Sequence, residues 1–211
     1  SATATNTEGL PLIRAGVGRS VITPPVGTSL AGYFHDRVSE CVRDDLHCNA
    51  VVFGAAGQRL AVVSCDLIAL CRDITDPAKA LIEQETGLKP EQVLICCTHT
   101  HTGPETRRGR VVPWNDAYLE TLPRLIADAV KQAAADLFDA FVFPGRQQEP
   151  DLGSIRLGRR KDGAEVFSKT DVLGPTSSVD PEVITVFIRD RENRVRGVLV
   201  NYANHGDVIG G

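Results

Sequence analysis

Two histidines lie one residue apart directly after an apolar run in the middle of the chain. His99 and His101 belong to the string T-H-T-H-T-G-P over 98–104, which follows the run V-L-I-C-C over 93–97. A third histidine, His205, follows another apolar run near the end of the chain. Catalytic zinc takes three protein ligands and keeps a fourth position for water. The pattern therefore predicts that two strand ends bring these histidines together on a metal ion.

The spacing of the pair suits a shared ligand, although the pair alone is a weak motif. Side chains on an extended segment alternate with a period of two, so His99 and His101 are expected to point to one side. Histidines between threonines can instead form hydrogen bonds with backbone groups of a loop. The presence of His205 at a second strand end is the reason to favour a metal site. Asp66 follows the run over 60–65. It is expected to be a metal ligand, a residue that bonds to a metal ligand, or a turn residue, and the sequence favours the turn residue.

Composition restricts the class of protein. The chain has 211 residues, which suits one domain with a proper core. Its formal net charge of -4 argues against nucleic acid as the main partner. No apolar run approaches the roughly 20 residues that a membrane-spanning helix needs, so no transmembrane segment is predicted. A small-molecule substrate is the expected partner, and the sequence does not indicate an oligomeric state.

Six cysteines bear on the compartment. Cys65, Cys96 and Cys97 lie in or beside apolar strand-like runs, where cysteine behaves as a small hydrophobe. No C-x-x-C spacing occurs, which argues against a structural zinc cluster. Reduced thiols favour the cytoplasm, whereas a removed signal peptide would place the protein in the periplasm or outside the cell. Residues 1–9 do not resemble a signal peptide, and the chain has no methionine, so its native start is expected to be missing.

Periodicity predicts an α/β (α+β) fold, with a mixed β-sheet, hairpins and flanking helices. A flexible lead-in is expected over 1–13, and 146–181 form a long polar excursion of the kind that often carries function. The active site is expected where strands end at their carboxyl ends. The predicted strands lie near 16–23, 50–53, 60–65, 93–97, 140–143, 183–188 and 195–200, and the helices span 77–86 and a stretch from about 116 with an apolar stripe to 137.

Prolines and glycines set the expected boundaries. Asp76 is the predicted N-cap of the first helix, with Pro77 as its first residue and Gly87 as its stop. Pro144 is expected to end the strand that begins at 140.

The sequence resembles the N-terminal portion of the neutral/alkaline (non-lysosomal) ceramidase family over about residues 14–206. The string at 98–104 is specific, and the supporting landmarks are G-V-G-R-S-V-I-T-P at 16–24, A-G-Y at 31–33, V-V-S-C-D-L at 62–67, D-P-E-V at 180–183 and N-Y-A-N-H at 201–205. The resemblance implies that 14–211 is a catalytic domain truncated at its C-terminal end. The family's remaining zinc ligands, a glutamate and a tyrosine, come from beyond this stretch, so these residues alone are expected to be an incomplete enzyme.

The resemblance also implies an activity and a set of site residues. The activity is zinc-dependent hydrolysis of the N-acyl amide bond of ceramide-like lipids or other N-acyl substrates. By this resemblance His99 and His205 bind Zn²⁺, and His101 contacts the zinc-bound water and the substrate oxyanion. The family also places an arginine at the reacting centre, for which spacing favours Arg156 and leaves Arg159 open. The residues by themselves do not separate ligand from non-ligand within the pair.

One loop departs from the family, and two other functions stay open. Residues 105–110 read E-T-R-R-G-R, where ceramidases carry small, glycine-rich residues. This loop indicates either a polar or anionic amide substrate or a solvated surface turn, and the turn is favoured. The alternatives to the amidase are a non-catalytic binding module with an incomplete metal site and a metal hydrolase acting on a different ester or amide.

Overall fold

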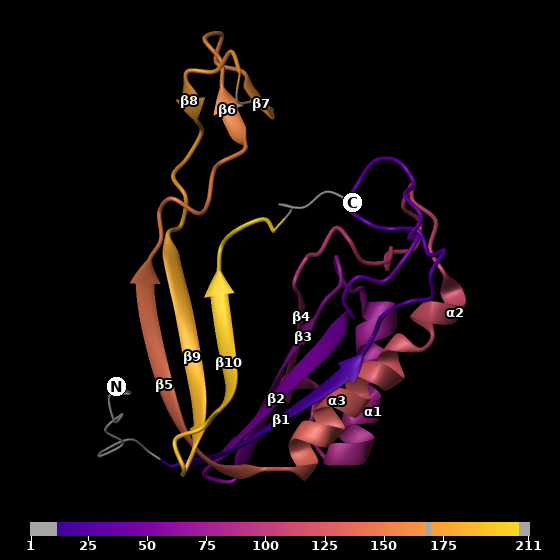
Figure 1. Ribbon diagram of the computed structural model, residues 1–211, viewed down its shortest axis with the longest axis vertical. Helices are drawn as coiled ribbons and strands as arrows, with labels where there is room; N and C mark the ends of the chain where they lie inside the picture. Colours follow the sequence, from indigo (N-terminus) through magenta and orange to yellow (C-terminus); the bar gives the residue numbers. More distant parts are fainter. Residues whose placement is uncertain (1–11, 168–169, 207–211) are drawn as a thin grey trace. The chain divides into compact units, whose positions relative to one another are not determined.

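The computed structural model describes residues 12–167 and 170–206, which form two compact units. The lead-in expected over 1–13 lies outside the described residues except at its end, where Ile13 begins the first strand. The first unit holds the chain up to Val142 together with 188–197, and the second holds 143–187 and 198–205. Figure 1 labels the strands and helices of both.

The predicted mixed sheet is confirmed. Its seven strands follow the order β10-β9-β5-β1-β2-β3-β4. The pairs β1–β2 and β2–β3 are antiparallel, and β4 runs parallel to β3. The strand bounds are β1 Ile13–Val21, β2 His47–Ala55, β3 Gln58–Cys65, β4 Val93–Cys97, β5 Phe138–Gln148, β9 Glu182–Asp190 and β10 Val195–Tyr202.

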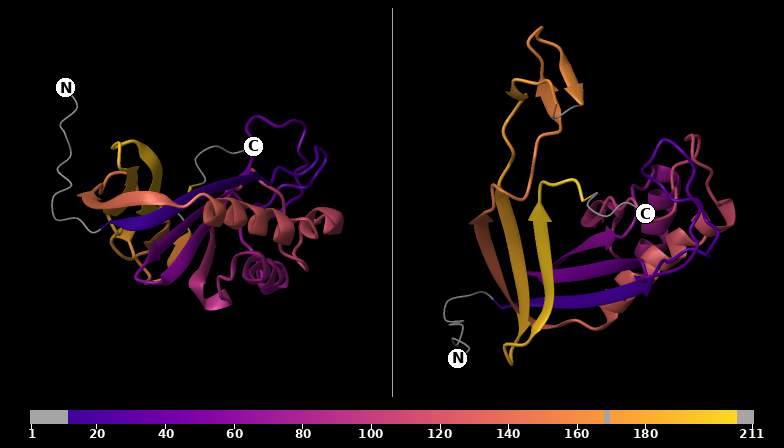
Figure 2. Two further views of the ribbon diagram at one scale, coloured as in Figure 1. Left: turned by 90° about the horizontal axis from the view of Figure 1, so that it is seen from below. Right: turned by 45° about the horizontal axis from the view of Figure 1, so that its top comes forward.

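Two helices cover one face of the strands β1 to β3 in the first unit. They are α1 (Arg72–Thr86) and α3 (Leu122–Ala135), which pack against each other as well as on the sheet (Figure 2). The short helices η1 (Pro90–Gln92) and α2 (Asp116–Leu119) precede β4 and α3. The core between these layers is apolar; among its members are Val52, Val63, Leu67, Ile74, Ile82, Leu119, Leu122, Ile126 and Val130.

Both helix predictions were wrong at a boundary. α1 begins at Arg72 and contains Pro77, because Ile74 is buried on the same stripe as Ala78 and Ile82 and anchors an additional N-terminal turn. The long helix expected from about 116 is interrupted between α2 and α3. Pro123 lies at the start of α3, where its missing N–H prevents a continuous hydrogen-bond ladder from α2.

The strand predicted to end at Pro144 continues to Gln148. Among the described residues, β1 pairs with β5 at Phe138–Ala140, so Pro144 lies past the paired stretch that is described. Proline is tolerated in a strand where no ladder donor is required.

The polar excursion in the second unit contains a small sheet of its own. It has the order β7-β6-β8, formed by β6 (Leu157–Arg159), β7 (Glu165–Phe167) and β8 (Gly174–Pro175). Across the described part of the chain, no helix is both long enough and apolar enough to cross a membrane.

Two glycines of β1 allow α3 to lie directly on the strand. A Cβ atom added at Gly16 would lie 1.9 Å from the carbonyl oxygen of Ala133, and one at Gly18 would lie 2.0 Å from that of Ala129. Both oxygens belong to helix backbone, which cannot move aside as a flexible side chain can. Glycine in a strand is typical of such a close approach of another backbone.

We expect Gly18→Ala to lower the free energy of unfolding by at least about 1–3 kcal/mol, because the methyl group must displace α3. Gly54→Ala in β2 is the matched control, since its Cβ would meet the side chains of Arg14 and Arg59 at an ordinary 3.6 Å. Urea unfolding of the two variants measures the difference. Equal midpoints would contradict the packing described for α3.

Candidate metal centre

The end of β4 is tied to the loop that follows β3. In the parallel pair, Cys65 is opposite Cys97. One residue further on, the Thr98 N–H donates to the Cys65 carbonyl at 2.9 Å, and the His99 N–H donates to the Leu67 carbonyl at 3.0 Å. The two strand ends therefore share an edge, as expected for neighbouring parallel strands.

His99 is held by both its backbone and its ring. Its φ of 61° lies in the left-handed region, which few residues other than glycine adopt. Its Nδ1 lies 2.8 Å from the Ile68 carbonyl, so we assign the proton to Nδ1 and the lone pair to Nε2. Metal-binding histidines typically donate their second ring nitrogen to a carbonyl or carboxylate in this way.

The expected extended geometry of the His-x-His pair was wrong, because the left-handed backbone at His99 breaks the alternation of the strand. The two rings nevertheless lie close together, with centroids 5.1 Å apart and planes at 69°. The kink at His99, and not the strand period, therefore brings the imidazoles together. His99 is exposed and His101 is half-buried.

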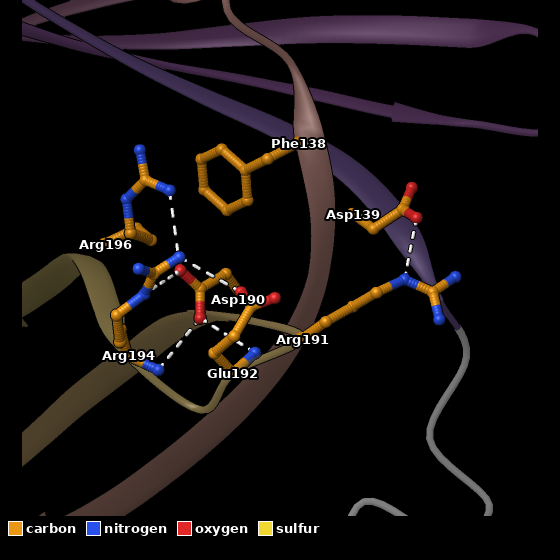
Figure 3. Close-up of a pocket in the computed structure, with 7 residues that line it drawn as sticks. All are labelled: Phe138, Asp139, Asp190, Arg191, Glu192, Arg194 and Arg196. Atoms are coloured by element: carbon orange, nitrogen blue, oxygen red, sulfur yellow. Dashed lines mark hydrogen bonds and ion pairs between the residues drawn. The ribbon is translucent and has the colours of Figure 1, made fainter.

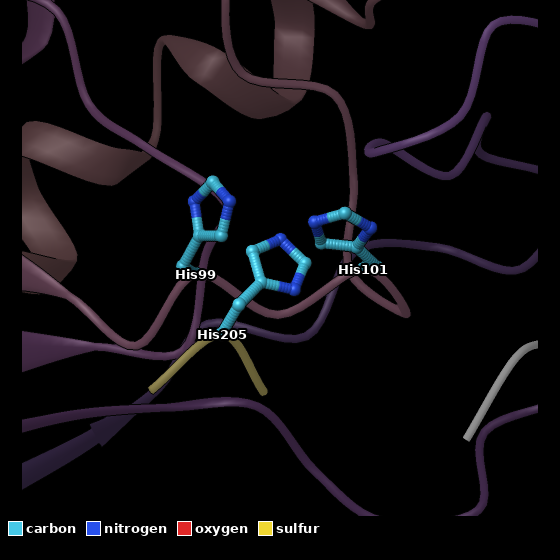
Figure 4. Close-up of side chains that lie close together, drawn as sticks. All are labelled: His99, His101 and His205. Atoms are coloured by element: carbon cyan, nitrogen blue, oxygen red, sulfur yellow. The ribbon is translucent and has the colours of Figure 1, made fainter. Parts of the chain in front are cut away.

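The three histidines singled out in the sequence are the candidate metal ligands, and Figure 4 draws their side chains. His99 and His101 belong to the first unit, whereas His205, which is half-buried and follows β10, belongs to the second. Imidazole nitrogens are ligands that zinc prefers.

Asp66 has the structural role that the sequence favoured. Its carboxylate accepts the backbone N–H of His47 at 3.0 Å, and its own N–H donates to the His47 carbonyl at 2.9 Å. These contacts cap the ends of β2 and β3. Asp66 does not belong to the histidine group.

The loop over 105–110 is only partly the solvated turn that the sequence favoured: 108–110 are exposed, but Glu105 is only 1% exposed. Its carboxylate accepts two hydrogen bonds of 2.7 Å from the Arg107 guanidinium. Burial alone raises the pKa of Glu105, but the hydrogen bonds from Arg107 outweigh it and hold the pKa below its ordinary value. Arg108 is paired as well, with Asp73 and Asp116.

The two candidate arginines both belong to the second unit and differ in their partners. Arg156 is exposed and directly precedes β6. Arg159, within β6, forms an ion pair of 3.1 Å with Glu165 on β7. Arg159 is thus engaged in its own small sheet, and Arg156 stays the candidate for the reacting centre.

All six cysteines are free thiols; Cys48 and Cys65 are buried in the core and Cys97 packs against it, whereas Cys96, which the sequence also assigned to an apolar environment, is exposed. Cys48 and Cys65 face each other across β2 and β3 with sulfur atoms 3.7 Å apart. A hydrogen bond with Cys48, together with burial, raises the pKa of Cys65, and burial raises the pKa of Cys97 to about 12. These thiols therefore stay protonated near neutral pH and pack as apolar groups.

A polar hollow in the first unit is lined by a network of ion pairs. It has a volume of about 230 Å³ and is drawn in Figure 3. Asp190, 4% exposed, accepts from Arg194 at 2.7 Å, and Arg196 lies 3.5 Å from the same carboxylate oxygen. Arg191 pairs with Asp139 at 2.8 Å. These contacts brace the turn between β9 and β10 and show no arrangement suited to catalysis.

Comparison with solved structures identifies the fold. The chain is similar to neutral ceramidase from Pseudomonas aeruginosa, with a TM-score of 0.71 and 20% identity over 92% of this chain and 32% of that chain. A ceramidase complexed with C2 gives a TM-score of 0.68 and 19% identity over 92% of this chain and 31% of that chain. No family model matches the sequence, and no curated protein does. The chain thus has a ceramidase-like fold and spans about a third of the length of these structures.

The buried pair of Glu105 and Arg107 predicts a pH-dependent stability. We expect Glu105→Gln to lower the free energy of unfolding by about 1.5–3 kcal/mol at pH 7, because charge-assisted hydrogen bonds are lost. A carboxyl with a depressed folded pKa contributes stability above its ordinary pKa of 4.5 and loses it as the pH falls through the folded value. The difference between wild type and variant should therefore shrink in acid.

Urea unfolding between pH 7 and pH 3 measures this difference, with the exposed Glu120→Gln as control. A Glu105→Gln penalty that stays constant over this range would contradict the assigned ionisation.

Proposed function

We propose that this chain is part of a zinc-dependent hydrolase that cleaves the N-acyl amide bond of ceramide-like or other N-acyl substrates. The observation that carries the proposal is the close pair of His99 and His101 in a ceramidase-like fold, and the sequence resemblance adds His205. Imidazoles at strand ends fit a catalytic zinc, which requires few protein ligands and an accessible position for water.

We assign His99 and His205 to the metal and His101 to the substrate. The hydrogen bond from His99 Nδ1 to the Ile68 carbonyl supports this assignment, because it leaves the lone pair of Nε2 available to a metal ion. The sequence resemblance supports the division of roles between His99 and His101. Further ligands from a longer protein would complete the site.

The chemistry follows from these roles. Zinc, when bound, acts as a Lewis acid and lowers the pKa of a coordinated water to near neutrality. His101 lies beside His99 and donates a hydrogen bond to the oxygen of the amide carbonyl as negative charge develops on it. Arg156 supplies a second, permanently charged donor for the same oxygen.

The sequence left open a polar or anionic substrate recognised by the arginines of 105–110. Arg107 and Arg108 are already paired with acidic side chains, so neither offers an uncompensated charge to a substrate. Of these arginines, the exposed Arg110 is therefore the candidate contact for an anionic amide.

A non-catalytic binding module is the second candidate. It is favoured by one observation: the chain spans about a third of the ceramidase structures it resembles. A hydrolase of another ester or amide class is the third candidate. A panel of ester and amide substrates distinguishes the two, because the binding module should turn over none of them.

Zinc binding tests the metal assignment. We expect the chain to bind one zinc ion, measured by calorimetry and elemental analysis, and His99→Ala to weaken binding by more than about tenfold. His47→Gln, a histidine outside the group, is the control and should bind as wild type does. Zinc bound at less than one ion per chain, in an amount that His99→Ala does not change, would contradict the assignment. Zinc binding without turnover of a fluorogenic N-acyl amide would instead support the binding module.

The arginine assignment is tested by a matched pair of variants. We expect Arg156→Ala to lower kcat for an N-acyl amide by about 10²–10³, the usual cost of removing one oxyanion donor. Arg159→Ala should leave kcat near that of wild type, because it removes only an exposed ion pair with Glu165. The reverse result would assign Arg159 to the reacting centre.

A further inference from the structure

The segment over 27–39 lies alongside the loop that carries the histidine pair. Leu30 bridges to Pro104, and the Ala31 N–H donates to the Gly103 carbonyl at 2.9 Å. The Glu105 N–H donates back to the Ser29 carbonyl at 3.1 Å. Both segments belong to the first unit, so the loop after His101 has a fixed backbone partner.

Gly32 brings this segment into contact with the His101 ring. Its φ of 99° lies in the left-handed region, and a Cβ atom added there would lie 2.4 Å from Cγ and Nδ1 of His101. No residue with a side chain fits this position without displacing the imidazole. The backbone at Gly32 therefore forms one wall against the ring.

Arg37 joins the backbone and the ring of this arrangement. Its Nη2 donates to the His101 carbonyl at 2.6 Å and to the Ala31 carbonyl at 3.1 Å. Its guanidinium also lies 3.8 Å from the centroid of the Tyr33 ring. That ring meets the His101 imidazole edge-on, with centroids 5.8 Å apart. The Arg37 guanidinium thus contacts the His101 carbonyl directly and the His101 ring indirectly, through the Tyr33 ring.

The remaining donors of Arg37 point to a role beyond stability. Its Nε and Nη1 are buried, and neither has a hydrogen-bond partner within 12–167 and 170–206. A buried donor without a partner costs free energy, and such groups are typical of residues retained for a functional arrangement.

We propose that Arg37 is a positioning residue for His101, acting through the His101 carbonyl and through the Tyr33 ring. The proposal rests on the proposed function, in which His101 contacts the reacting oxygen. Lysine does not reproduce this arrangement, because its ammonium is not planar and cannot stack on the Tyr33 ring as the guanidinium does while it donates to both carbonyls. The inferred effect is on the placement of His101 and not on metal binding.

The test compares Arg37→Lys with Arg43→Lys, which changes an exposed arginine shortly after this segment. We expect Arg37→Lys to lower kcat for an N-acyl amide by about tenfold or more, since small displacements of a reacting group are costly. KM and zinc affinity should change by less than about twofold, as expected when only transition-state contacts are lost. Arg43→Lys should behave as wild type does. Unchanged kcat in Arg37→Lys, or a loss shared equally by zinc affinity and thermal stability, would overturn the proposal.

A second readout does not depend on activity. In metal-free protein at constant pH, the imidazole ¹H–¹⁵N NMR signals of His101 should move in Arg37→Lys and stay unchanged in Arg43→Lys. Absence of hydrolysis by the wild type would count against the proposed function only. Unmoved His101 signals would count against the role of Arg37, whether or not the protein is active.

Discussion

The hydrogen bonds between the end of β4 and the loop after β3 determine where the proposed chemistry takes place. They hold His99 by its backbone N–H and by its ring Nδ1, on the Leu67 and Ile68 carbonyls. Leu67 and Ile68 are themselves buried, so the loop that receives His99 is anchored in the core. A left-handed backbone at His99 is sustained because these surroundings fix it. The core formed by α1, α3 and β3 is thus connected to His99 by the two short loops that follow β3 and β4.

A second constraint comes from the buried charge next to the histidine loop. Glu105 is neutralised by Arg107, and its backbone N–H bonds to Ser29. The next residue, Thr106, donates its hydroxyl to the Ala69 carbonyl. Residues 105 and 106 therefore link the segment that contacts His101 with the loop that holds His99. The charges of Glu105 and Arg107 therefore serve the architecture of this loop.

The sequence was sufficient for the features that depend on apolar runs and on residue identity. Val93–Cys97 and the hairpin of β2 and β3 follow directly from continuous apolar stretches, and His99 and His101 follow β4 as the apolar run predicts. The kink at His99 was not predictable, because its cause is a hydrogen bond to Ile68, a residue 31 positions away in the chain. The burial of Glu105 was hidden for a similar reason, since E-T-R-R-G-R has the composition of a surface turn. The role of Arg37 depends on a carbonyl 64 residues away.

Helix boundaries failed for a different physical reason. Local capping at Asp76 and Pro77 suggested a start, but burial of Ile74 outweighed that preference and lengthened α1. Tertiary packing commonly overrides local propensity in this way. The apolar periodicity that includes Ile74 therefore marks the start of α1 better than the capping residues do.

Zinc K-edge X-ray absorption of the zinc-loaded chain tests most directly whether histidine side chains held at strand ends bind zinc. We expect nitrogen ligands at about 2.0–2.1 Å with the multiple scattering of at least two imidazoles. A spectrum that shows only an oxygen shell, without imidazole scattering, would contradict this expectation.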